Sequence, residues 1–281
     1  MGDLREHRVE RALKNYPAEM AWAIIQAKNQ AFGIATRDLR EMVIMPEVSE
    51  VPNTGEHIRG VINLRGRVLP LIDLRKRIGV ASLAEENAAF LAMMEQREKD
   101  HHNWLDELEA SVRERREFRL TTDPHQCAFG KWYDTYKPES TLVAMHLKKF
   151  DQPHQQIHAV AVEVAKLEAE GQIDRAHELI EETRTGVLAR LVTLFAELSS
   201  LAHESRREIA LIVEDEGKRF AISADSALSV EKLAAGSIEA LEAGVGVTHG
   251  GVVQRFGKRI KTGEIILILE SDRLREGVAF S

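Results

Sequence analysis

The sequence holds a single cysteine, Cys127, among eleven histidines. One cysteine cannot close a disulfide within the chain, so its sulfur is available for metal binding or redox chemistry. His154 and His158 are four residues apart, and on a helix their imidazoles project from one face and can bind the same ion. His101 lies one helical turn before Trp104 on a predicted apolar stripe, which directs a third imidazole inward. Together these side chains predict a metal site.

Three imidazoles and one thiolate form a closed tetrahedral ligand set that suits zinc, with Zn–S near about 2.3 Å and Zn–N near about 2.0 Å. Copper would favour more sulfur ligands. Zinc binding can supply on the order of 10 kcal/mol of apparent free energy, comparable with the stability of a whole domain. An isolated H-x-x-x-H pair is more often a solvated helix face, and His102, His125 and His146 are alternative ligands.

Helical patterns surround these residues. From residue 82 onward a long amphipathic helix is predicted from the spacing of Phe90, Met94, His101, Trp104, Leu105, Leu108 and Val112. A turn-rich segment, 121–140, follows, and a bend at Gly130 would present the cysteine sulfur, with Phe129 and Trp132 as anchors.

Two further helix boundaries can be read beyond that segment. Gly171 is expected to end the helix that carries the histidine pair, and Asp174 is expected to cap the next helix. Three long helices and a short piece near the cysteine predict a four-helix bundle.

Strand patterns lie on both sides of the helices. Residues 21–80 alternate short apolar runs such as GVINL and VLPLIDL with turn residues, and the pattern returns after residue 206 in IALIVEDEGKRFAIS, VVQRF and EIILILE. We therefore predict a β domain built from residues 1–81, which include an N-terminal extension, and 206–281. The bundle, 82–205, would be inserted into one of its loops, because exposed loops tolerate long insertions. Three consecutive independent domains are the alternative.

Composition narrows the functional classes. The 281 residues carry 38 basic and 45 acidic side chains, a net charge of −7, which argues against binding to the phosphates of nucleic acids. No apolar run approaches the roughly 18 residues needed to cross a bilayer, and the charged start of the chain does not resemble a signal peptide. We expect a cytoplasmic protein with no membrane insertion.

The motifs HxxW, CxFGxW and HxxxH, in this order and at these spacings, resemble the chemoreceptor zinc-binding (CZB) domain over roughly residues 85–203. The resemblance implies that His101, Cys127, His154 and His158 bind zinc. It also implies that the module senses zinc or an oxidant such as hypochlorous acid through the zinc-bound thiolate of Cys127, and that it often forms dimers. A coordinated thiol is deprotonated, and a thiolate is the form that oxidants attack.

The β segments resemble a second family. GVINLRGRVLPLIDLRKRIG, residues 60–79, reads as two strands joined by a turn at Gly66, with Arg65 and Arg67 exposed. With FGIATRDLREMV before it and IALIVEDEGKRFAISADSALSVEKL after the insertion, it resembles the CheW-like domain, an adaptor that couples chemoreceptors to the CheA histidine kinase. That family has two small β-barrels. The segment RFGKRIKTGE is longer than the family's usual turn, and LILESDRL lacks its more apolar ending.

By position, the resemblance implies partner contacts for the residues of one loop and for one acidic residue: Asn63, Leu64, Arg65, Gly66 and Glu41. The expected function is a chemotaxis adaptor, without enzymatic activity, that carries a zinc or redox sensor and can dimerise through the bundle. A purely structural zinc is one alternative. A zinc hydrolase is another, but Gln155 stands where such an enzyme needs a glutamate base, and four protein ligands leave no place for water.

Overall fold

The computed structural model describes residues 20–138, 140–205, 207–233, 237–241 and 251–278. The expected N-terminal extension, residues 1–19, lies outside the described residues. The chain forms two compact units: Met1–Glu85 together with Arg206–Ser281, and Glu86–Ser205. The first unit holds the described strands and the second holds the long helices, so a helical segment interrupts a β fold, as the sequence predicts.

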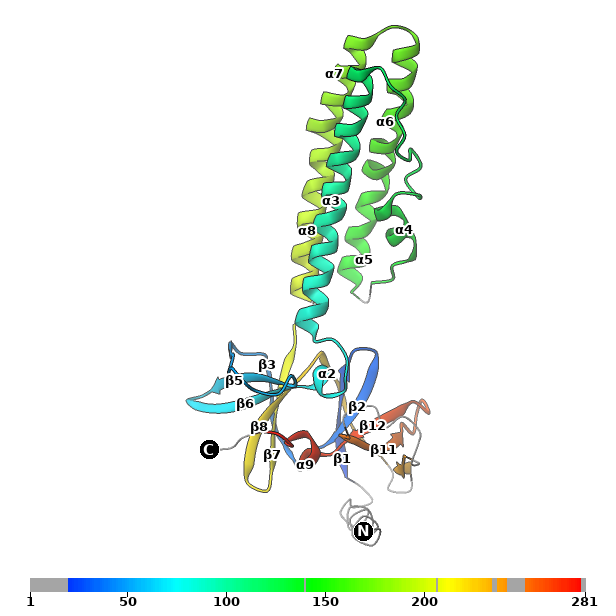
Figure 1. The fold of residues 1–281 in the computed structure, drawn as a ribbon. Helices are drawn as coiled ribbons and strands as arrows, with labels where there is room; N and C mark the ends of the chain where they lie inside the picture. The colour runs from blue at the N-terminus through cyan, green and yellow to red at the C-terminus, as the bar shows by residue number, and fades with distance from the viewer. Residues whose placement is uncertain (1–19, 139, 206, 234–236, 242–250, 279–281) are drawn as a thin grey trace. The chain divides into compact units, whose positions relative to one another are not determined.

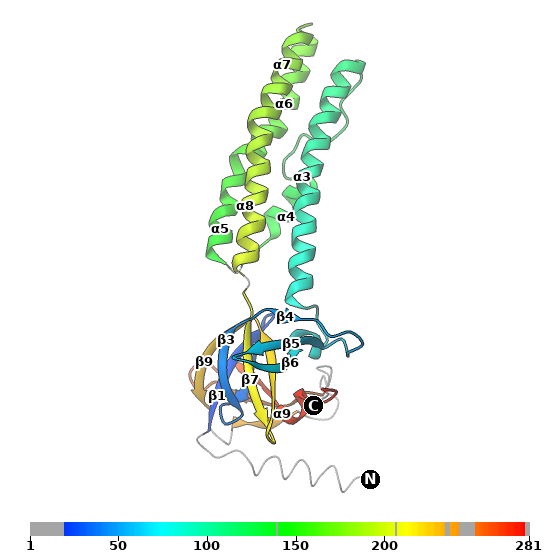
Figure 2. The same cartoon turned by 90° about the vertical axis from the view of Figure 1, so that its left-hand side faces the viewer.

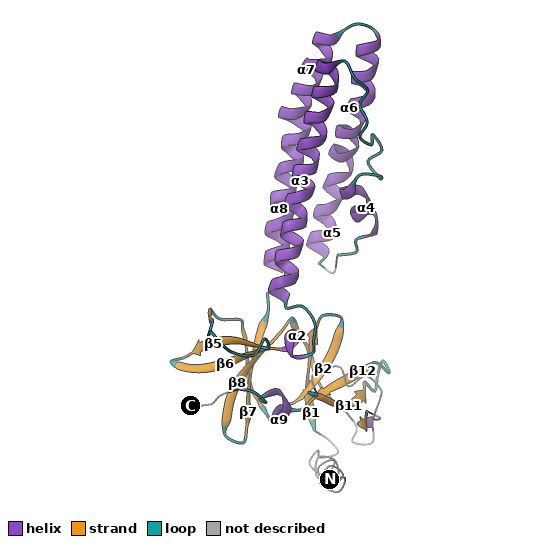
Figure 3. Ribbon diagram, in the orientation of Figure 1, coloured by secondary structure: helices purple, strands orange, loops and turns teal. Residues whose placement is uncertain are grey.

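The β unit contains two six-stranded sheets. One has the order β10-β11-β12-β2-β1-β9, with β1 (Ala21–Ala27), β2 (Gln30–Ala35), β9 (Ser226–Lys232), β10 (Glu239–Ala240), β11 (Val253–Lys258) and β12 (Ile265–Leu269). The other has the order β3-β7-β8-β6-β5-β4, with β3 (Leu39–Ile44), β4 (Val48–Ser49), β5 (Ile58–Leu64), β6 (Arg67–Asp73), β7 (Ile209–Asp215) and β8 (Lys218–Ala224). Two short helices complete the unit, α2 (Leu74–Arg77) and α9 (Ser271–Leu274). Each sheet takes strands from both sides of the helical segment (Figure 3), which excludes three independent domains.

Apolar side chains from both sheets meet in one core. Ile25 and Phe32 of the first sheet and Leu211 and Phe220 of the second are fully buried in the same cluster. Burying a large apolar side chain contributes about 1.5–3 kcal/mol relative to leaving it exposed. Packing between the sheets therefore joins the two chain segments into one fold.

Two hairpin turns have the same tight geometry, and the first is the turn predicted at Gly66. Between β5 and β6, Arg65 and Gly66 have φ values of 52° and 83°, and the Asn63 side chain accepts a hydrogen bond from the Gly66 N–H at 2.9 Å. Between β7 and β8, Glu216 and Gly217 have φ values of 48° and 76°. Two successive positive φ values are typical of the tight turn whose twist matches that of paired strands.

The long helix α3 (Leu83–Glu114) begins at a capping box. The Glu85 N–H donates to Ser82 Oγ at 3.1 Å, and the Ser82 N–H donates to the Glu85 carboxylate at 2.9 Å. These two bonds satisfy backbone N–H groups at the start of the helix that have no acceptor within the helix. Along α3, the predicted apolar stripe is buried at Phe90, Met94, His101, Trp104, Leu105, Leu108 and Val112.

The remaining helical elements form the predicted bundle with α3. They are α4 (Ala128–Thr135), α5 (Thr141–Leu147), a 3-10 turn (Lys148–Phe150), α6 (Asp151–Ala169), α7 (Ile173–Thr183), a π-helical turn (Arg184–Leu188) and α8 (Ala189–Ser205). In Figures 1 and 2, α3, α6 and α8 run alongside one another, and their apolar side chains share one core.

One predicted helix boundary is confirmed and the other is wrong. Gly171, with φ of 74°, follows the end of α6, and the Gln172 N–H donates back to the Leu167 carbonyl at 2.8 Å. Asp174 does not cap α7, because the cap position belongs to Gln172, which makes no side-chain capping bond. Asp174 lies in the first turn of α7 instead, where its negative charge interacts favourably with the positive end of the helix dipole.

One helix differs from the expectation that no segment is long and apolar enough to cross a bilayer. The continuous helix Ile173–Ala202 is long and apolar enough, by length and composition, to cross a bilayer. Its residues Ile180, Leu191, Phe195 and Leu198 are at most 2% exposed and belong to the bundle core. These side chains pack in the bundle core, although only 33% of the apolar window of this helix is buried.

Candidate metal centre

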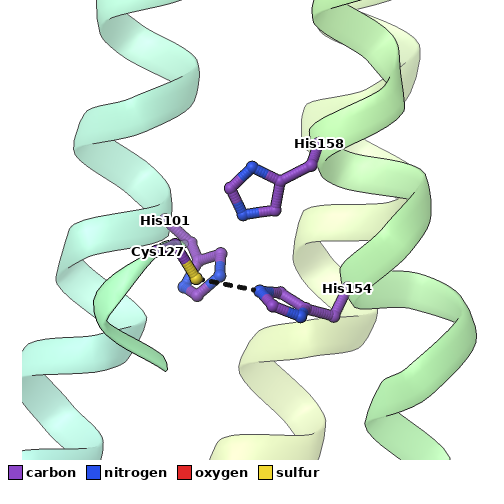
Figure 4. A group of neighbouring side chains, drawn as sticks. All are labelled: His101, Cys127, His154 and His158. Carbon is purple, nitrogen blue, oxygen red and sulfur yellow. Dashed lines mark hydrogen bonds between the residues drawn. The ribbon is translucent and has the colours of Figure 1, made fainter. Parts of the chain in front are cut away.

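Four side chains from three elements meet inside the bundle. His101 comes from α3, Cys127 directly precedes α4, and His154 and His158 lie one turn apart on α6 (Figure 4). Their candidate ligand atoms lie within 4.8 Å of one another. The histidines are at most 6% exposed, and the cysteine is partly exposed. The structure thus brings together the four residues that the sequence indicated as ligands.

The ring of His101 is oriented by its own helix. Its Nδ1 lies 2.6 Å from the carbonyl oxygen of Arg97, one turn earlier. A carbonyl can only accept, so Nδ1 carries the proton and Nε2 keeps a free lone pair. Within the described part of the chain, Nε2 is buried without a hydrogen-bond partner. Histidine ligands typically donate their second N–H to such a carbonyl, so His101 is prepared to bind metal through Nε2.

The ring of His158 gives the clearest test of whether the site fits a metal. Both of its ring nitrogens are buried, and the Thr121 backbone lies within hydrogen-bonding reach of the ring, which leaves one nitrogen without a partner among the residues that the structure describes. A buried polar atom without a partner costs about 1–3 kcal/mol. Coordination to a cation would satisfy one of these nitrogens as well as His101 Nε2. With the neighbouring sulfur, this donor set fits zinc.

Cys127 is the N-cap residue of α4. Its Sγ accepts a hydrogen bond from the Gly130 N–H at 3.1 Å and lies 3.2 Å from His154 Nε2. Burial raises the pKa of the Cys127 thiol, while the backbone N–H groups of Gly130 and Phe129 lower that pKa by favouring the thiolate. The helix N-terminus thus supports the charged sulfur that a metal ligand requires.

Gly130 has a different role from the predicted bend. It lies within α4, and a Cβ atom at this position would be 1.8 Å from the carbonyl oxygen of Pro124. The absence of a side chain therefore lets the first turn of α4 pack against the segment that leads into Cys127. This close approach holds the sulfur in place.

Aromatic rings surround the centre. Phe129 is 1% exposed, and its ring lies 4.9 Å from that of His154 and 5.8 Å from that of His101, centroid to centroid. The Trp104 ring lies 5.0 Å from that of His158, and its Nε1 donates to the Thr121 carbonyl at 2.8 Å. These contacts hold the imidazoles in place and fix the loop before Cys127.

The alternative histidines lie outside the four-residue cluster. His125 is exposed, and its Nδ1 lies 2.9 Å from the Asp134 carboxylate, which raises the pKa of His125. His146 is buried and its Nε2 lies 2.9 Å from the Leu194 carbonyl oxygen. His102 is not among the grouped residues either.

The three histidines of the cluster, His101, His154 and His158, are neutral at ordinary pH. Burial lowers the pKa of His154 to about 3 and the pKa of His158 to about 4, and the nearby His101 adds to both shifts. Burial also lowers the pKa of His101. Neutral imidazole is the form that binds metal.

In the metal-free protein, the free energy of unfolding is expected to fall as the pH falls from about 6.5 toward about 4. Histidines of the unfolded chain take up protons in that window, whereas His154 and His158 do so only at lower pH, so acid favours the unfolded state. Each contributes ~1.4 kcal/mol per pH unit. Urea unfolding of chelator-treated protein across this range measures the slope.

Two variants control the pH experiment. His158→Gln should reduce the slope, and His177→Gln, which lies outside the cluster, should leave it unchanged. A wild-type slope of zero, or the same slope in all three proteins, would show that the buried imidazoles do not govern acid stability.

The residues with expected partner contacts lie in the β unit. Arg65 is at the β5–β6 turn with its side chain 78% exposed, and its Nη2 lies 2.9 Å from the Glu41 carboxylate on β3. Asn63 and Gly66 close the same turn through their hydrogen bond. Leu64, at the end of β5, is partly buried. The turn thus presents an arginine and a carboxylate together.

Comparisons with known proteins point to two families. The sequence model of the CheW-like domain matches residues 22–106, and that of the chemoreceptor zinc-binding domain matches residues 101–165. A stretch of 66 residues is 32% identical to the chemotaxis protein CheW of Klebsiella aerogenes and covers 23% of this chain. It spans 40% of that relative's length.

Among solved structures, the scaffolding protein TtCheW from Thermoanaerobacter tengcongensis is similar, with a TM-score of 0.43 and 15% sequence identity over 93% of this chain and 94% of that chain. The second family match contains all four clustered side chains, His101, Cys127, His154 and His158. The chain therefore carries a CheW-like domain together with a chemoreceptor zinc-binding domain, which lies in the helical segment that interrupts the β fold.

Proposed function

We propose that this protein is a cytoplasmic, non-enzymatic chemotaxis adaptor that links chemoreceptors to a CheA-type histidine kinase. Its inserted bundle, residues 82–205, binds zinc and senses zinc or an oxidant through Cys127. The observation that carries the proposal is the cluster of three imidazoles and one thiol inside a helical unit that interrupts a CheW-like domain.

The proposed zinc ligands are His101, Cys127, His154 and His158. When bound, zinc would hold the sulfur as a thiolate and join α3, α4 and α6 at one point. The protein prepares this set by directing His101 Nε2 inward through the Arg97 carbonyl and by placing Cys127 at a helix N-terminus. Four protein ligands leave no coordination position for a substrate, which favours a binding role over hydrolysis.

Cys127 is the candidate redox group because it is the most exposed of the four ligands. Hypochlorous acid oxidises a thiolate to sulfenic acid and is itself reduced to chloride, with its oxygen and proton ending on the sulfur. Sulfenic acid is a poorer zinc ligand than thiolate, so oxidation would weaken the site. A purely structural zinc would show no such response.

The contacts around Cys127 offer a path for a signal. Phe129, two residues after Cys127, packs on Phe195 of α8 with ring centroids 5.2 Å apart and on His101 of α3 at 5.8 Å. Along the chain, α3 follows the first β segment and α8 precedes the second. A displaced α4 would therefore disturb both helices that lead into the adaptor fold, which is the kind of two-state coupling that regulation requires.

Adaptor contacts are proposed at the β5–β6 turn, through Asn63, Leu64, Arg65 and Gly66, with Glu41 beside them. The exposed guanidinium of Arg65 is a planar donor suited to acidic groups of a kinase or receptor. The bundle can also mediate a homodimer through exposed apolar residues such as Leu142 and Met145 of α5.

One experiment tests both halves of the proposal. Zinc-loaded protein is treated with hypochlorous acid, released zinc is followed with a chromogenic chelator, and capture of a purified CheA-type kinase is measured before and after treatment. We expect zinc release from the wild type and altered kinase capture. In Cys127→Ser, oxidant-dependent zinc release should be absent.

Arg65→Glu separates the adaptor function from the sensor. It should lower kinase capture about tenfold, as expected when a charge at an interface is reversed, and should leave zinc binding unchanged. Arg113→Glu, an exposed charge reversal on α3, is the matched control. Oxidation of Cys127 without zinc release would favour a structural metal, and unchanged capture in Arg65→Glu would reject the proposed contact.

A further inference from the structure

A pocket of about 430 Å³ lies beside the candidate zinc ligands. Three of the four ligands line it, namely His101, Cys127 and His158, whereas His154 does not. The pocket is formed by residues of α3, the loop before α4, the start of α4 and α6. The pocket is partly open to solvent, so most of the ligand set lies beside a solvent-accessible space.

The rest of the lining combines apolar walls with oxygen donors. Trp104, Leu120 and Phe129 form apolar walls. Asp100, Asn103 and Gln126 also line the pocket, and residues of these types carry oxygen atoms of the kind that hold hydrated divalent cations. Its lining includes no lysine or arginine among the described residues. The pocket thus offers oxygen donors beside a nitrogen and sulfur site.

Asp100 is the carboxylate of this pocket and lies next to His101 in the chain. Its Oδ2 accepts from Arg97 at 2.6 Å and its Oδ1 accepts from Gln96 at 2.8 Å. The Asp100 side chain is 37% exposed. A carboxylate has about four acceptor sites, and these two contacts occupy two of them, so Asp100 keeps acceptor positions for a cation.

We infer that this pocket is the route by which zinc enters and leaves the centre, and that Asp100 is a transient ligand on that route. A hydrated zinc ion would first exchange water for the Asp100 carboxylate and then pass to the imidazoles and the thiolate. The protons that zinc displaces are released to water, since only the neutral imidazoles and the thiolate bind the ion. This inference rests on the proposed zinc binding and adds to it a route and a residue outside the four ligands.

A transient ligand has a kinetic signature that a structural residue lacks. It stabilises the ion during both entry and exit, so its removal slows association and dissociation together and changes Kd little. A charge that only attracts the ion from a distance would change the association rate alone. A residue that only supports the fold would change Kd through faster dissociation.

The experiment uses the full chain and measures both rates. Association is followed with cobalt(II), through the absorption of its thiolate bond, and zinc dissociation is followed with a chromogenic chelator in excess. We expect Asp100→Asn to slow both rates about tenfold, within the range of electrostatic effects on association, and to change Kd by less than about threefold. Glu95→Gln makes the same charge change on α3 outside the pocket and should leave both rates unchanged.

A second pair of variants tests the pocket itself. Leu120 is 44% exposed at the pocket, so Leu120→Trp should narrow the route without touching a ligand and should slow both rates together. Val162→Trp, at an exposed position of α6 outside the pocket lining, is the control. Rates equal to those of the control variants, or slower association with unchanged dissociation, would overturn the inference. A chain that binds no zinc would instead overturn the proposed function.

Discussion

Chelation of zinc from the purified protein is expected to loosen the helical bundle while the β domain stays folded. Without the ion, His101 Nε2 and one ring nitrogen of His158 have no partner among the described residues, and the metal that would join α3, α4 and α6 is lost. Binding of a structural zinc contributes on the order of 10 kcal/mol of apparent free energy, which is as much as a domain's whole stability.

The tryptophans allow the two units to be followed separately. Trp22 lies in β1, whereas Trp104 and Trp132 lie in the bundle. In Trp22→Phe the fluorescence reports the bundle alone, and calorimetry reports both units. The expected result after chelation is a large decrease in the melting temperature of the bundle transition, with the β transition in place. Equal bundle stability with and without chelator would contradict this role for zinc.

Gly130→Ala is expected to be the most damaging single-methyl substitution near the centre. The new Cβ would lie 1.8 Å from the Pro124 carbonyl oxygen and 3.0 Å from the His125 Cα, and both are backbone atoms that cannot rotate away. The first turn of α4 must shift, and Cys127 with it. We expect a loss of about 3 kcal/mol or more in bundle stability, as for severe overpacking, and a weakening of zinc affinity by about 100-fold.

Gly186→Ala is the matched control for that substitution. Gly186 lies in the π-helical turn, and a Cβ atom there would meet nothing within 4 Å. This change should leave zinc affinity as it is and alter stability by about 1 kcal/mol at most, in the stabilising direction, because alanine favours helix more than glycine does. If both alanine variants bind zinc like the wild type, the close approach at Gly130 has no functional role.

Much of the fold could be predicted because its signals are local in the sequence. The tight turns at Gly66 and Gly217 follow from positive φ values that glycine adopts readily. The stripe from Phe90 to Val112 follows from helical periodicity. The ligand candidates follow from local signals too. H-x-x-x-H spacing places His154 and His158 on one helix face, His101 lies on the apolar stripe, and Cys127 is the single cysteine.

The features that were missed depend on contacts between distant segments. Gly130 is needed for an approach to Pro124 that no local pattern shows, and the sequence suggested a bend instead. Asp174 has the residue type of a helix cap, yet the chain begins α7 after Gln172, directly beyond the end of α6. The π-helical turn at Arg184–Leu188 follows no local sequence pattern. There Arg184 contacts the carboxylates of Asp106 and Glu109 on α3 at 2.6 Å.

Metal analysis combined with X-ray absorption at the zinc edge tests the assignment of one zinc to these four side chains most directly. The expected result is one zinc per chain, bound by one sulfur at about 2.3 Å and three nitrogens at about 2.0 Å, with the sulfur signal absent in Cys127→Ser. A chain that takes up no zinc when the metal is supplied, or a zinc coordinated without sulfur in the wild type, would contradict it.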